Sequence, residues 1–187
     1  MAEASSLVRL QDEYDVELDW RGFELHPETP PGGRRLADVF GEERSRAMHE
    51  YLTRFAAEFG VTGMTFRDVM PSTRRALAVA EFARDHGKLH PFRAAAMEAA
   101  WRHGQDVEDP EVLALCARAA GLDPVAAVEA FDEPRYLARV MTMGAEARRS
   151  GVTGIPTVLI GGRRVVGCQP YEVQAAAAEA EGAKRRN

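Results

Sequence analysis

The chain has 187 residues, of which 45% are apolar and 28% are charged, and its formal net charge is −5. These proportions are typical of a globular domain, and the length suits one domain or one domain with a large insertion. The acidic balance argues against nucleic-acid binding, which needs a basic surface. The sequence has no apolar run near the roughly 18 residues of a membrane span and no signal-peptide pattern at residues 1–15. Membrane, secreted and disordered classes are therefore set aside.

The N-terminal forty residues combine three kinds of pattern. Apolar residues at a helical spacing predict a helix over residues 4–14. Residues 16–21 alternate strictly between apolar and polar side chains, which predicts a half-buried strand. Residues 26–33 are rich in proline and glycine, which predicts a loop.

Residues 42–150 are predicted to be helical throughout. The first helix is marked by apolar residues at three-and-four spacing: Met48, Tyr51, Leu52, Phe55 and Phe59. Further helices are predicted near residues 73–86, 91–103, 110–120, from 124 on, and 134–150. The pairs Asp109-Pro110 and Asp123-Pro124 are typical helix starts, because the carboxylate caps the helix and proline lacks an N–H that would go unused there.

The last forty residues change character. Residues 157–160 and 163–166 are β-prone runs joined by Gly161-Gly162, which predicts a β-hairpin with a tight turn. A final helix is predicted to open at Pro170. The basic run at residues 184–186 is interpreted as a solvated tail. This order of elements favours an α/β fold in which a helical domain is inserted into a small sheet.

Pro156 begins the first of these two strands, after a loop containing Gly151 and Gly154. A cis peptide bond here would hold the backbone N–H and C=O of Ile155 outward, as a short edge for an extended peptide. A trans proline that simply opens a strand fits the same residues. The residues alone leave both possibilities open.

The two cysteines, Cys116 and Cys168, lie far apart and form no C-x-x-C pair. They make no disulfide framework, so a reducing cytoplasm is expected. Cys116 stands among apolar residues of a predicted helix and is expected to be a buried structural residue. Cys168 immediately precedes a predicted helix start, where a thiolate is stabilised. It is therefore a possible redox-sensitive thiol, with a structural role as the alternative.

Residues 151–173 read Gly-Val-Thr-Gly-Ile-Pro-Thr-Val-Leu-Ile-Gly-Gly-Arg-Arg-Val-Val-Gly-Cys-Gln-Pro-Tyr-Glu-Val. This run resembles the C-terminal half of the DsbA-like thioredoxin-fold family, in particular its FrnE-type branch, which is cytoplasmic. Residues 20–27, 109–113 and 121–123 extend the resemblance over nearly the whole chain.

The resemblance implies a thioredoxin-like domain made of residues 1–39 and 144–187, with an all-helical insertion over residues 40–143. It implies a cis-proline at Pro156 and a thiol–disulfide oxidoreductase whose substrate is bound by Gly154, Ile155 and Pro156. The implied partner is a protein thiol or disulfide, or a small thiol.

One departure from the family pattern is plain. Members that exchange disulfides carry C-x-x-C at the end of a first strand, where it opens the first helix, and Met1 of this chain already lies within the corresponding helix. We expect either that the chain begins at an internal methionine or that the dithiol has been lost; as written, it cannot complete a dithiol–disulfide cycle. A sheet without its first strand has an uncovered slot, so dimerisation or strand exchange is expected.

Two other functions stay open. The first is a non-enzymatic peptide-binding or scaffold domain. The second is a glutathione-dependent transferase or isomerase, because kappa-class glutathione transferases and 2-hydroxychromene-2-carboxylate isomerases resemble this architecture and place a serine near the glutathione sulfur. Ser5 and Ser6 are the nearby serines, although helix capping is the simpler role for them. Glutathione is the only cofactor considered, and the five histidines form no metal-binding pattern.

Overall fold

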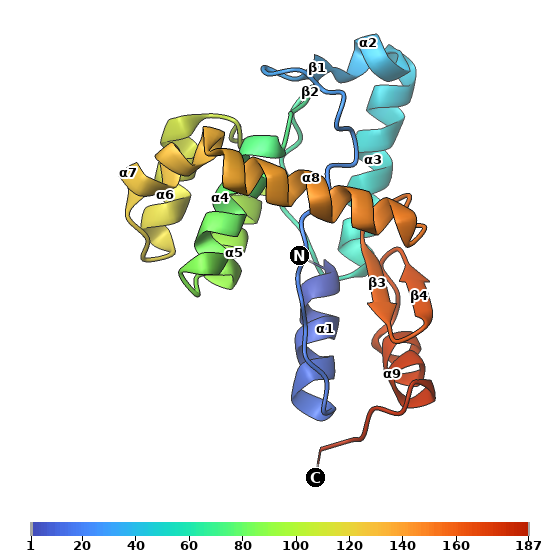
Figure 1. Cartoon of the computed structure of the whole chain (residues 1–187). Helices are drawn as coiled ribbons and strands as arrows, with labels where there is room; N and C mark the ends of the chain where they lie inside the picture. Colours follow the sequence, from blue (N-terminus) through green and yellow to red (C-terminus); the bar gives the residue numbers. More distant parts are fainter. Residues whose placement is uncertain (1, 187) are drawn as a thin grey trace. The chain divides into compact units, whose positions relative to one another are not determined.

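The computed structural model describes residues 2–186, with the side chains of residues 6–186 (Figure 1). The chain divides into two compact units. We call the first the terminal unit, which comprises the residues up to Arg21 and those from Ala147 on; the second, the helical unit, is Gly22–Glu146. In the part of the chain that is described, no helix has the length and apolar character of a membrane span.

The terminal unit contains α1 (Ala2–Glu13), β3 (Thr157–Ile160), β4 (Arg163–Val166) and α9 (Tyr171–Ala180). The predicted hairpin is confirmed: β3 and β4 pair antiparallel and the turn between them has two residues. The turn begins at Gly161, whose φ of 55° suits glycine.

One hydrophobic core holds the terminal unit together, and α1 packs against α9 within it. Its buried side chains are Leu7, Leu10, Tyr14, Ala175 and Ala178. Half-buried side chains from the hairpin and from the segment after α1 pack on the same core: Val16, Leu18, Trp20, Val158, Ile160, Tyr171 and Ala183. The two β-prone regions of the unit therefore share one core.

The strand predicted over residues 16–21 does not form. The burial pattern is as predicted, because Val16, Leu18 and Trp20 are half-buried while the residues between them are exposed. A strand also needs a neighbour that supplies ladder hydrogen bonds. Among the described residues, β3 and β4 pair only with each other, so this segment joins the core without joining a sheet.

The basic C-terminal run is not a solvated tail, and that interpretation is wrong. The Asp15 N–H donates to the Lys184 carbonyl at 2.9 Å, and the Arg186 N–H donates to the Glu13 carbonyl at 2.7 Å. Between them, Tyr14 and Arg185 form an isolated antiparallel bridge. The end of the chain is thus fixed to the end of α1.

The helical unit begins with short elements that have no sequence period and were not predicted. They are β1 (Arg34–Arg35), α2 (Leu36–Phe40) and β2 (Val69–Met70), which lie on either side of α3 (Glu42–Glu58). β1 and β2 pair antiparallel, and the Leu36 N–H donates to the Asp68 carbonyl at 2.8 Å. These bonds are the reason that residues 22–39 belong to the helical unit, whereas the sequence interpretation drew that boundary at residue 40.

The remaining helices are close to their predicted positions: α4 (Arg74–Asp85), α5 (Leu89–Trp101), α6 (Pro110–Ala119), α7 (Pro124–Glu129) and α8 (Pro134–Arg149), with a 3-10 turn at Ala130–Asp132. Both predicted aspartate caps are confirmed. Asp109 accepts from the Glu111 N–H, and Asp123 accepts from the Val125 N–H, each at 2.8 Å. The core of the unit includes Phe92, Leu113 and Tyr136, which are almost fully buried.

Candidate functional site

The candidate site is the loop that leads into β3. The Ile155–Pro156 peptide bond is cis, and the Ile155 side chain is 57% exposed. The Pro156 carbonyl accepts from the Gly167 N–H at 2.9 Å, and the Gly154 carbonyl accepts from the Thr157 hydroxyl at 2.7 Å. No hydrogen bond within the described chain ends on the backbone of Ile155. Ile155 therefore presents an open N–H and C=O between two fixed neighbours.

The loop rises from the end of α8, where Gly151 terminates the helix with a φ of 76°. The Arg164 guanidinium, which comes from β4, donates to the Ser150 carbonyl at 3.3 Å and to the Gly151 carbonyl at 2.8 Å. A cation is favoured at a helix C-terminus, where carbonyl groups lack partners. Arg164 thus ties the loop to the hairpin. The sequence offered no signal for this role, because Arg164 reads as one of several exposed strand residues.

The far end of the hairpin is fixed by Glu181, just after α9. Its carboxylate accepts from the Gly162 N–H at 3.0 Å and pairs with the Arg163 guanidinium at 3.1 Å. The hairpin is therefore held at its turn by Glu181 and at its open end by Arg164. This anchoring gives the exposed backbone of Ile155 a rigid support.

Cys168 lies half-buried in the bend between β4 and α9. α9 begins at Tyr171 with Pro170 as its N-cap, so Cys168 stands before the helix and outside its first turn. The neighbouring Gly167 is the residue bonded to the Pro156 carbonyl. The structure thus brings two of the sequence candidates, the Pro156 loop and the Cys168 segment, into one part of the terminal unit.

Cys116 is buried in the core of the helical unit, 5% exposed, as the sequence predicts. Burial raises the pKa of its thiol above the ordinary value. A buried thiol with a raised pKa is a poor nucleophile. No disulfide joins Cys116 to Cys168.

The other residues considered in the sequence do not form a site. Ser6 is half-buried on α1, and the side chain of Ser5 lies outside the described residues. The histidines and acids among the described residues form no group of three that could hold a metal ion.

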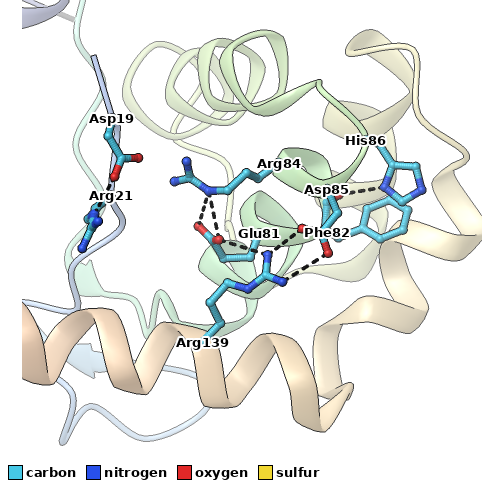
Figure 2. A network of polar contacts seen from close by, with 8 residues as sticks. All are labelled: Asp19, Arg21, Glu81, Phe82, Arg84, Asp85, His86 and Arg139. Atoms are coloured by element: carbon cyan, nitrogen blue, oxygen red, sulfur yellow. Dashed lines mark hydrogen bonds and ion pairs between the residues drawn. The ribbon is translucent and has the colours of Figure 1, made fainter. Parts of the chain in front are cut away.

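The helical unit contains a charged network that the sequence did not suggest (Figure 2). Glu81 on α4 is 2% exposed and accepts from the Arg84 guanidinium at 3.0 Å. Arg139 on α8 donates to Asp85 at 2.7 Å and lies 3.5 Å from Glu81. The hydrogen bond from Arg139 lowers the pKa of Asp85 below its ordinary value. The network neutralises a buried carboxylate and joins two helices, which is a structural role.

Comparisons with known proteins agree on one family. The model of the DsbA-like thioredoxin domain matches residues 2–179. The uncharacterized protein YwbO of Bacillus subtilis is 25% identical over 162 residues, which cover 85% of this chain and 79% of that protein. The crystal structure of a probable DsbA oxidoreductase from Streptomyces coelicolor has a TM-score of 0.78 at 27% identity and covers 96% of this chain and 81% of that one. The structure of a 2-hydroxychromene-2-carboxylate isomerase has a TM-score of 0.70 at 18% identity, with 97% and 88% covered, a likeness of fold alone.

Proposed function

Since this chain belongs to the DsbA-like thioredoxin family, we propose that its terminal unit docks an extended, cysteine-containing peptide along Ile155. The proposed activity is that of a FrnE-type thiol–disulfide oxidoreductase, and the chain supplies the substrate-docking part. The single observation that carries the proposal is the exposed backbone of Ile155. An extended peptide that meets such an edge gains main-chain hydrogen bonds, as in β-strand addition.

Dithiol exchange itself is assigned to no residue of this chain. The reaction needs a thiolate that attacks a disulfide sulfur and a second thiol that resolves the mixed disulfide. The 187 residues contain no C-x-x-C, and Cys116 is buried in the other unit. Cys168 alone could form a mixed disulfide but could not resolve it. The proposal includes a cytoplasmic location, in keeping with two cysteines outside a disulfide.

Titration calorimetry with a matched pair of peptides tests the docking. The first is a short extended peptide with one central cysteine, and the second carries backbone N-methyl groups on both sides of that cysteine. Each net hydrogen bond is worth about 1 kcal/mol, so we expect the methylated peptide to bind about tenfold more weakly or worse. Equal binding of the two peptides, or no binding of either, contradicts the proposal.

Two controls separate the proposal from its alternatives. The chain should fail to catalyse insulin reduction, because no dithiol is present; turnover would show that a residue given no role here performs the exchange. Reduced glutathione should give no saturable heat. Saturable binding would instead favour a glutathione-dependent transferase or isomerase. Peptide docking combined with no thiol exchange in any longer form of the protein would favour a scaffold domain.

A further inference from the structure

Helix α3 carries an apolar stripe that the described chain leaves largely uncovered. Of its seventeen residues, only Ser45 and Ala56 are buried. Tyr51 is 56% exposed, and its ring stacks on that of Phe55 with centroids 5.8 Å apart. Phe55 in turn lies 5.1 Å from Phe59. The aromatic rings therefore form a ladder along one side of the helix, where singly scattered apolar residues would need no explanation.

The stripe has opposite charges at its two ends. Arg44, Met48, Tyr51, Phe55 and Glu58 follow one another at spacings of four, three, four and three, so they lie on one face of α3. Arg44 and Glu58 are both exposed. Fourteen residues of helix separate them, which is about 21 Å along the axis. Tyr51 stands midway between the two charges.

We propose that this face of α3 is a self-association surface, and that its occupant is α3 of a second copy of the chain in antiparallel orientation. A two-fold axis through Tyr51 sets Arg44 of one copy opposite Glu58 of the other at both ends of the contact. A parallel pair would instead set Arg44 against Arg44 and Glu58 against Glu58. The stripe is thus complementary to itself in one orientation only, as an isologous interface requires.

The surface is one helix face, which is small beside a standard interface, so we expect a weak dimer with a Kd on the order of tens of micromolar. Sedimentation velocity of the full chain from about 1 to about 200 µM, a span that brackets such a Kd, measures it directly. A dimer over this range is the expected result, and a monomer at every concentration overturns the proposal.

Two substitutions of exposed apolar residues test the location. Tyr51→Ser removes the ring at the centre of the contact and should weaken dimerisation about tenfold or more, since central aromatic residues dominate interfaces. Val125→Ser on α7, where the residue is 65% exposed, is the matched control and should change the Kd less than about twofold. Circular dichroism checks that both variants keep their helix content. A dimer that does not respond to Tyr51→Ser overturns the proposal and points to the sheet edge of the terminal unit.

A charge-reversal cycle tests the orientation. Arg44→Glu and Glu58→Arg should each weaken the dimer about threefold to tenfold, and the double variant should recover most of the loss, as expected for exposed ion pairs. The Arg44 guanidinium also lies 5.7 Å from the Phe40 ring centroid within the chain. Arg44→Glu loses that contact with or without the second substitution, so recovery reports the intermolecular pair. A double variant no tighter than either single one overturns the antiparallel arrangement.

Discussion

The carboxylate of Glu13, at the end of α1, accepts a hydrogen bond from the Arg185 guanidinium at 2.8 Å. The two residues are 172 positions apart and join the two ends of the chain within the terminal unit. The same carboxylate accepts from the Tyr171 hydroxyl at 2.8 Å and from the Arg9 guanidinium at 2.7 Å. Three donors therefore hold one negative charge beside the core formed by α1 and α9.

This arrangement predicts a pH dependence of stability. The hydrogen bonds from Arg9, Tyr171 and Arg185 lower the pKa of Glu13 from 4.5 to about 2. Because the folded-state pKa is the lower one, the stabilisation is fully present above pH 4.5 and is lost as pH falls toward 2. Glu13→Gln should therefore unfold at lower urea concentration than the native chain at pH 7, and the difference should shrink as pH falls from 4.5 to 2. Asp12→Asn, on an exposed neighbour, is the control. A difference that stays constant with pH contradicts the assignment.

Removal of residues 184–187 should destabilise the terminal unit. The described part of this segment exchanges backbone hydrogen bonds with Glu13 and Asp15, and bonds of this kind contribute about 1 kcal/mol each. We expect a loss of about 2 kcal/mol in denaturant unfolding and faster amide exchange at the end of α1. An unchanged unfolding midpoint would show that the segment is dispensable.

Arg164 should act on peptide docking without contacting the peptide. Arg164→Ala removes the donors that hold the carbonyls of Ser150 and Gly151, which should cost about 1 kcal/mol of stability. It should also weaken peptide binding about threefold, because the loop before Ile155 loses its support. Arg164→Lys keeps the charge and should recover part of both effects. If stability falls while peptide affinity is unchanged, Arg164 has no positioning role.

Glu81 should be sensitive to the loss of its charge partners. Glu81→Ala leaves Arg84 and Arg139 without their buried acceptor, and breaking such a pair typically costs about 3 kcal/mol. Glu129→Ala, on the exposed face of α7, should cost less than about 0.5 kcal/mol. Urea unfolding of the two variants measures the contrast. Similar midpoints for both would mean that the network contributes nothing to the stability of the helical unit.

Local signals in the sequence were enough to predict the hairpin and most helices. Gly161-Gly162 marks a tight turn, and the aspartate caps at Asp109 and Asp123 mark helix starts, because each depends on residues within a few positions. Alternation over residues 16–21 predicted which side chains face the core but could not supply a partner strand. Burial of Cys116 was also predictable, because its neighbours along the helix are apolar.

The contacts that link distant parts of the chain were not predictable in this way. The bridge between Tyr14 and Arg185 and the contact of Arg164 with the end of α8 join segments that no periodicity relates. An arginine on a strand and a basic run at a chain end both resemble solvated surface. Their roles depend on carbonyl groups that the fold brings to them, so the support of the candidate site became visible only in the structure.

The amide of Ile155 provides the most direct test of the proposed docking. Its N–H should be in fast exchange with solvent in the unbound chain, because it donates to no described residue. On saturation with the cysteine-containing peptide, its proton resonance should move downfield and its exchange should slow about tenfold or more, in line with a new hydrogen bond. An Ile155 amide whose shift and exchange rate are the same with and without saturating peptide would contradict the account.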